Sequence, residues 1–366
     1  MYFRFKRLEQ GWNRLFIRAL GKLMPAAPHE KPDWDARPHR VLYLRYDKVG
    51  DMIVSMSLID AIAQSHPTIT LDVLASPANA PVLEGNPNVS SVIVWDKARP
   101  SGYARLLRQL RRARYDAVVD CMVLAPSTTT LLLMLASGAR HRIGIGGRIN
   151  DYALTTRVPP AISAAHHIDR SAVLATAFGV ELDEVDWQPV IYFSDDEIES
   201  ASNVWNAHDG IRQGMVARRL LLNVSAGRSP RRWPDHRYVA LVRHLRETAS
   251  DITIVVIGAP FDSARAMRIA ERGGVRYVAT PKLRDALALV ATTDFVVTPD
   301  TSIAHAASAC RKPSVVLFEK GKDTLWGRYR VPGRNVVSED KSLATLPVEP
   351  VIDAVDELLE MSFSTY

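Results

Sequence analysis

The regular alternation of short apolar runs with longer helical segments constrains the fold of this chain more than any other feature. In the first half, buried strands are expected at residues 41–44, 71–74, 92–94 and 117–120. Helices are expected at residues 52–64 and 105–114, between these strands. Strands that are apolar along their whole length are typical of parallel sheets covered by helices on both faces. The pattern therefore predicts an α/β protein with a doubly wound parallel sheet.

The alternation starts again after residue 216, which predicts a second domain of the same kind. Strands there are expected at residues 220–224, 252–257, 295–297 and 315–318. With 366 residues, the chain is long enough for two such Rossmann-like domains. In doubly wound sheets, ligands bind at the carboxyl ends of the strands, so a central cleft that both domains face is the expected site.

The domain boundaries are expected where this pattern begins and breaks. An acidic helix meets polar, glycine-bearing sequence within residues 185–215, which indicates a connection between the domains. The expected parts are a basic amphipathic helix (1–24), a linker with four prolines (25–39), a first domain (40–195), an interdomain connection (196–215), a second domain (216–349) and a closing helix (350–366).

Residues 1–24 combine a helical apolar stripe with a strong positive charge. They hold six Lys or Arg and one Glu, so their charge of +5 leaves the rest of the chain near +1 of the net +6. This is typical of a helix lying on an anionic membrane surface, and a helix docked on the protein's own surface is the alternative. Polar residues interrupt every apolar stretch, which excludes a secretory signal, and no run of about 18 apolar residues is present to span a bilayer. The stripe consists of Phe5, Leu8, Trp12, Leu15, Phe16, Ala19, Leu20 and Leu23.

A polar turn joins a buried strand to an alanine-rich helix within residues 298–307. Asp300 occupies the expected N-cap position, followed by Thr301 and Ser302. The N–H groups at a helix start lack partners within the helix and favour an anion, and small residues let a diphosphate come close. His305 lies one turn beyond Thr301 on the same helix face, where a structural role and a ligand contact are both open.

The first strand ends in the turn of residues 45–51, whose side chains are expected at the carboxyl end of that strand. Gly50 allows a tight turn, and Asp51 begins the next helix. A carboxylate at this place can act as a general base toward a hydroxyl nucleophile, or it can simply be the helix N-cap. Arg45 and Lys48 can hold an anionic substrate beside it, or they can be solvated surface residues.

The first strand of the second domain ends in a turn rich in arginine. Three arginines among small residues suit a diphosphate better than a neutral ligand, and a loop of solvated charges is the alternative. In a parallel sheet this turn and residues 298–307 converge on one crevice. The turn contains Ser225, Gly227, Arg228, Arg231 and Arg232, and the following strand ends at Gly258.

The other motifs do not indicate a metal, a dinucleotide or a nucleic acid. Cys121 and Cys310 lie far apart in apolar settings, without the spacing of a metal site or a disulfide. Residues 144–149 lack the third glycine of a dinucleotide fingerprint and precede no clear helix. A basic patch with Arg142 and Arg148 has no interleaved aromatic residues, so neither a nucleic-acid partner nor a cofactor is expected.

Four segments, in this order along the chain, form a familiar combination. Residues 41–51 end in Asp47-Lys48-Val49-Gly50-Asp51, and residues 167–170 read His-Ile-Asp-Arg, followed by Ala-Phe-Gly at 177–179. Residues 227–234 end in Arg-Trp-Pro, and residues 299–305 read Pro-Asp-Thr-Ser-Ile-Ala-His, with Pro313 beyond them. Together they resemble the first Gly-Asp turn, the late first-domain helix, the basic turn and the donor signature of glycosyltransferase family 9, the lipopolysaccharide heptosyltransferases.

The resemblance implies a GT-B fold, an ADP-activated heptose donor held mainly by the second domain, and an acceptor in the first. It also implies inversion at the anomeric carbon without a metal, with Asp51 as the catalytic base. Arg231 stands where the family commonly has a phosphate-binding lysine, and Ser302 where it commonly has a glycine. Arginine still offers charge and serine its backbone N–H, so a nucleotide-sugar donor remains the expectation.

These motifs assign candidate roles to individual residues. Asp300, being negative, is assigned to capping and to sugar hydroxyls, and the N–H groups of Thr301 and Ser302 are assigned to the phosphate. Leu283 is expected to border the adenine. The donor-binding residues are expected to be Ser225, Gly227, Arg228, Arg231, Gly258, Leu283, Asp300, Thr301, Ser302 and His305. The acceptor-binding residues are expected to be Arg45, Lys48, Gly50, Arg142 and Arg148.

The expected function is transfer of a heptose to a growing lipopolysaccharide core, at the cytoplasmic face of the inner membrane. The N-terminal helix then holds the enzyme near its lipid-linked oligosaccharide acceptor. One alternative is another nucleotide-sugar enzyme of the same fold, either an epimerase or a transferase of another sugar. A second alternative, a catalytically silent nucleotide-binding scaffold, is disfavoured by the carboxylate at Asp51.

Overall fold

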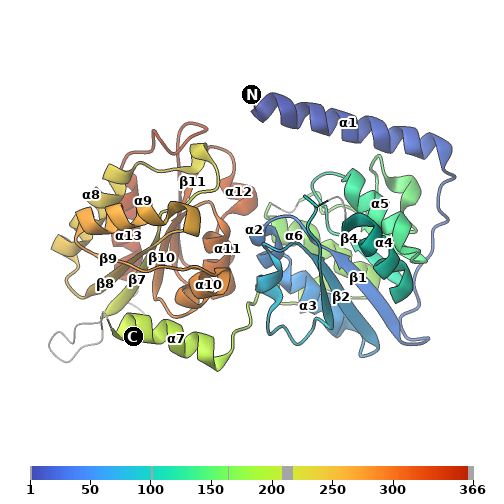
Figure 1. Ribbon diagram of the computed structural model, residues 1–366, viewed down its shortest axis with the longest axis horizontal. Coiled ribbons are helices and arrows are strands. Elements are labelled where there is room, and N and C mark those ends of the chain that lie inside the picture. The colour runs from blue at the N-terminus through green and yellow to red at the C-terminus, as the bar shows by residue number, and fades with distance from the viewer. Residues whose placement is uncertain (1, 100–101, 164, 208–216, 362–366) are drawn as a thin grey trace. The chain divides into compact units, whose positions relative to one another are not determined.

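The computed structural model describes residues 2–99, 102–163, 165–207 and 217–361, with side chains from residue 11 onward. The apolar and basic side chains expected before residue 11, such as Phe5 and Leu8, lie outside the described ones. The chain divides into two compact units, Met1–Trp187 and Gln188–Tyr366 (Figure 1). The sequence pattern placed this boundary after residue 195.

Unit 1 alternates strands and helices after a long N-terminal helix. Its helices are α1 (Tyr2–Leu23), α2 (Val49–Ile53), α3 (Met56–Ser65), α4 (Gly102–Ala113), α5 (Thr128–Ser137) and α6 (His167–Ala172). Its strands are β1 (His39–Leu44), β2 (Ile69–Ala75), β3 (Ser91–Val94), β4 (Ala117–Asp120), β5 (His141–Ile145) and β6 (Thr156–Val158). Short 3₁₀ helices are η1 (Ala80–Leu83), η2 (Asp151–Ala153), η3 (Val173–Phe178) and η4 (Leu182–Glu184).

Unit 2 repeats the alternation. Its helices are α7 (Asp195–Asn206), α8 (Asp235–Thr248), α9 (Ser263–Gly273), α10 (Leu283–Ala291), α11 (Ser302–Ala309), α12 (Asp323–Trp326) and α13 (Glu349–Met361). Its strands are β7 (Arg218–Asn223), β8 (Ile252–Ile257), β9 (Arg276–Tyr277), β10 (Phe295–Pro299), β11 (Ser314–Phe318) and β12 (Gly333–Val337). Its 3₁₀ helices are η5 (Ser229–Arg231) and η6 (Pro260–Asp262).

Both units contain a six-stranded parallel sheet with the same strand order. The order is β3-β2-β1-β4-β5-β6 in unit 1 and β9-β8-β7-β10-β11-β12 in unit 2. Each sheet therefore has a switch point, between β1 and β4 in unit 1 and between β7 and β10 in unit 2, where the chain changes its winding direction. Ligands of doubly wound sheets bind at the carboxyl ends of the strands beside such a point. The predicted doubly wound α/β class is confirmed.

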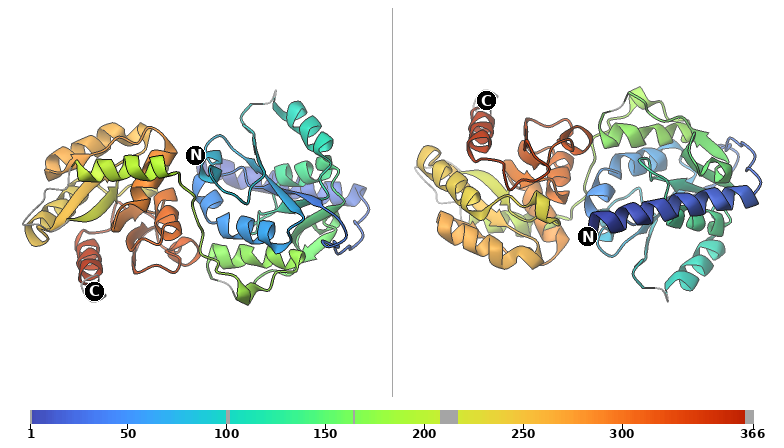
Figure 2. Two further views of the ribbon diagram at one scale, coloured as in Figure 1. Left: turned by 90° about the horizontal axis from the view of Figure 1, so that it is seen from below. Right: turned by 90° about the horizontal axis from the view of Figure 1, so that it is seen from above.

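Helices cover both faces of each sheet. In unit 1, α3 and α6 pack together on one side, and α4 and α5 pack together on the other (Figures 1 and 2). Fully buried apolar residues of β1 and β4, such as Leu42 and Val118, meet α4 residues such as Leu110 in one core. In unit 2, Leu222, Val297 and other buried strand residues form the corresponding core with α8 and α13. This packing fixes the positions of the turns at the strand ends.

One local prediction needs correction. The helix expected at residues 52–64 is two helices, α2 and α3, which break at Val54 and Ser55. The Ser55 hydroxyl lies in this break and donates to the carbonyl of Asp51 at 2.8 Å. The break turns α3 onto the sheet and leaves α2 as a short segment at the carboxyl end of β1.

Helix α1 docks on unit 1 along one side. Ile17 is fully buried against Leu131 of α5 and Ala153 of η2. The hydroxyl of Tyr152 donates to the carbonyl of Ile17 at 2.9 Å. A Cβ on Gly21 would lie 2.7 Å from the Tyr152 ring, so this helix residue must be small.

Candidate functional site

The carboxyl end of β1 carries a buried arginine. Arg45 is 1% exposed; its Nε donates to the Ser55 hydroxyl at 2.9 Å, and its Nη1 pairs with Asp47 at 3.1 Å. Burial lowers the pKa of Arg45, but Cys121, Asp47 and Asp51 raise it well above its usual value. The guanidinium is therefore a fixed positive charge surrounded by the groups of this turn.

Asp51 lies at the edge of this cluster, in the first turn of α2. Lys48, not Asp51, is at the N-cap position, so the interpretation of Asp51 as a simple cap is wrong. The carboxylate is half-buried and interacts electrostatically with Arg45. A half-buried carboxylate at this place can accept a proton from a hydroxyl group.

Asp120, which the sequence did not single out, lies across the switch point at the end of β4. It is 6% exposed, and burial raises its pKa, although the Met122 N–H, Arg148 and Arg45 oppose this shift. Arg148 donates to the carbonyls of Met122 and Val123 just beyond β4. The available signal was a single acidic residue at the end of the apolar run 117–120.

The expected acceptor residues divide between the two ends of the sheet. Arg45, Lys48 and Gly50 lie at the carboxyl end of β1, and Arg148 lies beyond the carboxyl end of β5. Arg142 is the second residue of β5, and its guanidinium donates to the carbonyl of Ala139 before that strand at 3.2 Å and to Ala153 at 2.6 Å. The structure does not bring Arg142 to Asp51.

In unit 2, a buried polar network links the ends of the two switch-point strands. Asn223 of β7 donates from Nδ2 to the hydroxyls of Thr298 at 2.9 Å and Thr301 at 3.2 Å. Its Oδ1 accepts from the N–H of Ser225 at 3.1 Å. Asn223 and Thr298 are 2% and 0% exposed, so the network is part of the core. It fixes both turns relative to each other and was missed because each residue is unremarkable in sequence.

The N-cap of α11 is Thr301, so the assignment of capping to Asp300 is wrong. The Thr301 hydroxyl accepts from the N–H of Ile303 at 3.3 Å. Strand β10 continues to Pro299, and Asp300 therefore lies between strand and helix, with its N–H donating to Leu317 of β11 at 2.9 Å. The N–H groups of Thr301 and Ser302 remain at the helix start, where the helix dipole favours an anion.

Asp300 instead pairs with the arginine turn. Its side chain is 4% exposed and lies 2.8 Å from Nη2 of Arg231, while Nη1 of Arg231 donates to the Asp300 carbonyl at 2.8 Å. Glu319, at the end of β11, lies 3.8 Å from Nε of the same guanidinium. Arg231 therefore holds residues 300–302 in place, a role that the sequence did not indicate.

The remaining expected donor residues lie around this edge of the unit 2 sheet. The Ser225 hydroxyl accepts from the N–H of Ala259 at 2.7 Å. A Cβ on Gly258 would lie 3.0 Å from Ala266 and 3.2 Å from this hydroxyl, so only glycine fits without displacement. Gly227 and Arg228 belong to the loop after β7, Leu283 begins α10, and His305 of α11 is buried with its ring 5.9 Å from that of Trp326.

Comparisons with known proteins show to which family the chain belongs. The sequence model of glycosyltransferase family 9 (heptosyltransferase) matches residues 103–348. The chain belongs to glycosyltransferase family 9. It is 25% identical over 340 residues to lipopolysaccharide heptosyltransferase 1 of Salmonella typhimurium, covering 86% of this chain and 99% of the relative. It is 23% identical over 293 residues to lipopolysaccharide heptosyltransferase 2 of Escherichia coli, with 76% and 82% covered.

Solved structures establish that this family 9 chain has a GT-B fold. A family 9 glycosyltransferase from Veillonella parvula superposes with a TM-score of 0.76 at 17% identity, covering 91% of this chain and 99% of that one. The E. coli heptosyltransferase WaaC with ADP superposes with a TM-score of 0.67 at 20% identity, covering 88% of this chain and 98% of that one. The chain is thus a glycosyltransferase of two Rossmann-like units. Within the described residues, no helix is long and apolar enough to cross a membrane, and no cluster of three His, Cys, Asp or Glu is placed to hold a metal.

Proposed function

We propose that this glycosyltransferase moves a heptose from an ADP-heptose-type donor to a lipopolysaccharide core acceptor, with inversion and without a metal. The observation that carries the proposal is the edge of the unit 2 sheet. There, the helix start of α11 and the arginine turn after β7 offer N–H groups and positive charge beside Asp300. This combination suits the diphosphate of a nucleotide sugar. The named relatives transfer heptose in lipopolysaccharide synthesis, which supports the sugar and the acceptor.

The donor is held by groups with distinct tasks. The N–H groups of Thr301 and Ser302 meet the phosphates, and Arg228 and Arg231 offset the charge that develops when the diphosphate departs. Asp300 is buried and holds the guanidinium of Arg231 in place, so the expected contact of Asp300 with sugar hydroxyl groups is replaced by this supporting role. Ser225 and Gly258 let the nucleotide approach the strand ends closely, Gly227 keeps the loop small, Leu283 borders the adenine, and His305 supports the helix start.

Asp51 acts as the general base. It removes the proton from the acceptor hydroxyl as that oxygen attacks the anomeric carbon, the bond from that carbon to the diphosphate breaks, and ADP leaves. Because attack comes from the side opposite the leaving group, the anomeric configuration is inverted. Lys48, Gly50 and Arg148 bind the anionic acceptor. The expectation that Arg45 binds it is wrong, because Arg45 is buried and holds Ser55 and Asp47 of this turn instead. Arg142 serves the fold of unit 1, because its guanidinium is held by two carbonyls before and after β5.

Membrane association is supported by the two faces of α1. Ile17 and its neighbours dock on unit 1, whereas Trp12, Leu15 and Phe16 are 71%, 61% and 46% exposed on another face. The basic residues Arg14, Arg18 and Lys22 flank this exposed face. A docked helix can therefore also lie on an anionic bilayer, and the enzyme works at the cytoplasmic face of the inner membrane.

The proposal is tested with ADP-heptose and a lipopolysaccharide core acceptor. Asp51→Asn is expected to lower kcat about 100- to 10,000-fold, the usual contribution of a general base, with ADP affinity unchanged. Turnover should persist in a metal chelator. Unchanged turnover in Asp51→Asn would refute the base assignment. Conversion of the donor without any acceptor would indicate an epimerase with the same fold. Turnover with another ADP-sugar in place of ADP-heptose would change the assignment of the donor sugar.

A further inference from the structure

A second basic segment remains unused by the transfer reaction. Residues 97–114 contain seven Lys or Arg and no Asp or Glu, whereas the whole chain has a net charge of +6. Outside this segment and residues 1–24, the chain is net negative. The positive charge of unit 1 is therefore concentrated in two places, α1 and the region of α4.

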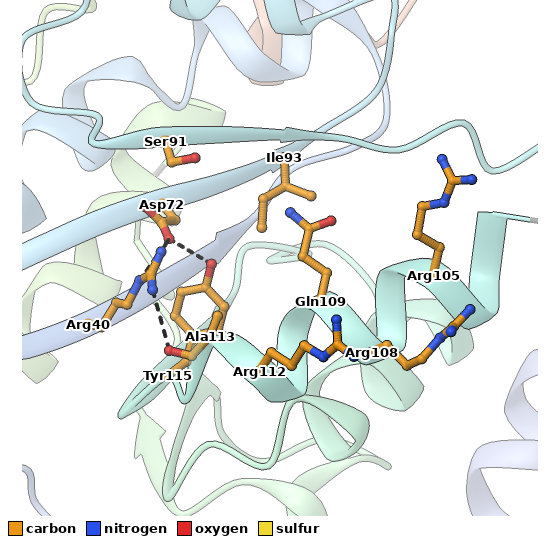
Figure 3. A pocket seen from close by; sticks show the side chains of 10 residues that line it. All are labelled: Arg40, Asp72, Ser91, Ile93, Arg105, Arg108, Gln109, Arg112, Ala113 and Tyr115. Atoms are coloured by element: carbon orange, nitrogen blue, oxygen red, sulfur yellow. Dashed lines mark hydrogen bonds and ion pairs between the residues drawn. The ribbon is translucent and has the colours of Figure 1, made fainter.

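The region of α4 forms one wall of a pocket. Its volume is about 500 Å³, and β1, β2 and β3 contribute the opposite side (Figure 3). This is within the size range of pockets that bind small molecules, roughly 300–1,000 Å³. The pocket is lined by Arg40, Asp72, Ser91, Ile93, Arg105, Arg108, Gln109, Arg112, Ala113 and Tyr115.

The floor of the pocket is a fixed network around Asp72. This carboxylate is fully buried and accepts from Nε of Arg40 at 3.0 Å, from Nη2 of Arg40 at 2.7 Å, and from the hydroxyl of Tyr115 at 2.7 Å (Figure 3). Among the described residues, Asp72 is the one carboxylate that lines the pocket, and it is bound to Arg40. It does not neutralise the arginines of α4.

Those arginines lie on successive turns of α4. Arg105, Arg108 and Arg112 are exposed, and like charges three or four residues apart on a helix repel each other. Arg112 is in the last turn, where the helix dipole favours a positive charge, but Arg105 and Arg108 are not. The helix dipole therefore does not explain why three arginines lie together on this wall, whereas a bound anion would relieve their mutual repulsion.

The pocket is separate from the catalytic edge. Arg40 and Ser91 are at the amino ends of β1 and β3, and Tyr115 precedes β4. Asp51 follows the carboxyl end of β1. Because all strands of the sheet are parallel, these groups lie at opposite edges.

We propose that this pocket binds the phosphate group of an anionic ligand, independently of the donor and the acceptor. Planar guanidinium groups hold phosphate oxygens through paired N–H donors, and Arg105, Arg108 and Arg112 supply them from one wall. The pocket has room for a phosphate with a small polar body, whose hydroxyl groups meet Gln109.

Two sources of this phosphate share the same chemistry. One is a free phosphorylated metabolite and the other is the headgroup of an anionic lipid. Both α1 and α4 pack against α5 in unit 1. The experiment therefore has one arm for each source.

The test compares two substitutions on the same helix. Arg108→Gln removes a charge that lines the pocket, and Arg111→Gln removes one that bonds instead to the carbonyl of Ala136 at 3.1 Å. The first arm measures binding of inorganic pyrophosphate by calorimetry, with ADP present to occupy the donor site. The second arm measures sedimentation with phosphatidylcholine vesicles, with and without phosphatidylglycerol.

We expect Arg108→Gln to weaken binding about tenfold in one arm, the loss of one hydrogen bond to a charged group, and Arg111→Gln to leave it within about twofold. A loss with pyrophosphate assigns the free metabolite, and a loss confined to phosphatidylglycerol vesicles assigns the lipid. Equal behaviour of the two variants in both arms overturns the proposal. Heptose transfer measured in the same variants is expected to be unchanged, so a failure here is distinct from a failure of the transferase assignment.

Discussion

The pairing of Arg231 with Asp300 gives a quantitative prediction about the donor turn. Arg231→Ala removes the partner of a carboxylate whose side chain is only 4% exposed. Removing one member of a buried pair costs about 3–5 kcal/mol, because the other charge stays buried without compensation. Arg231 itself is 21% exposed, so water reaches the pair, and we expect a loss of about 2–3 kcal/mol in the free energy of unfolding of unit 2.

A double-mutant cycle separates this interaction from other losses. Asp300→Asn removes the charge but keeps the backbone carbonyl that Arg231 contacts, and should cost about 1–2 kcal/mol. Arg231→Ala then no longer leaves the Asp300 charge without a partner, although Glu319 still loses its positive neighbour, so the double variant should be little worse than Arg231→Ala alone. The expected coupling energy is about 1.5 kcal/mol.

The chain offers a matched control in the exposed pair of Arg334 and Glu357. These groups lie 3.0 Å apart with side chains 53% and 59% exposed. Such a pair usually contributes about 0.2–1 kcal/mol. Hydrogen exchange of peptides from β7 and β10 measures the free energy of unfolding of unit 2 without contribution from unit 1. A coupling energy for Arg231 and Asp300 no larger than that of the control would refute the reasoning.

Three further outcomes are expected. The Arg284 guanidinium lowers the pKa of Glu197 to about 2. The stabilisation of unit 2 by this pair is therefore complete above about pH 4.5 and is lost as the pH falls toward 2. Glu197→Gln should abolish this acid dependence, which is measured by unfolding at a series of pH values. Gly258→Ala should weaken ADP binding and lower stability by about 1–3 kcal/mol, because the new Cβ meets Ala266; calorimetry and urea unfolding measure the two effects. Ile17→Ala should undock α1 and accelerate proteolysis within it, and an unchanged cleavage rate would contradict the docking.

The fold was predictable because the sequence pattern that indicates it, an apolar strand followed by a helix, is repeated along the chain. Strands buried on both faces are apolar along their length, and the chain repeats them between helices in both units. The break between α2 and α3 was not predictable, because no glycine or proline marks it. It depends on Ser55, whose hydroxyl accepts from buried Arg45 and donates to the carbonyl of Asp51. Tertiary contacts of this kind leave no local pattern.

The candidate site was predictable as a set of turns, but not in its internal pairing. The sequence pattern placed the N-cap at Asp300, but β10 extends to Pro299 and Arg231 reaches Asp300, so the helix begins one residue later, with Thr301 as its N-cap. Arg142 was grouped with Arg148 because they are close in sequence, yet Arg142 lies near the amino end of β5 and Arg148 lies beyond its carboxyl end. The basic helix at residues 105–114 was predictable from the sequence, but the pocket that it forms with β1, β2 and β3 was not.

The two switch points share one fold but differ in the sign of the charge that is accessible to solvent. Each places an arginine beside a carboxylate at the end of a central strand, but the burial is reversed. In unit 1, Arg45 is 2% exposed and its partner Asp47 is 29% exposed, so the accessible charge is negative. In unit 2, Asp300 is 4% exposed and Arg231 is 21% exposed, so the accessible charge is positive. In the proposed reaction, Asp51 takes up a proton beside the first pair and the diphosphate binds beside the second, so in each pair the buried group holds in place the charge next to the ligand.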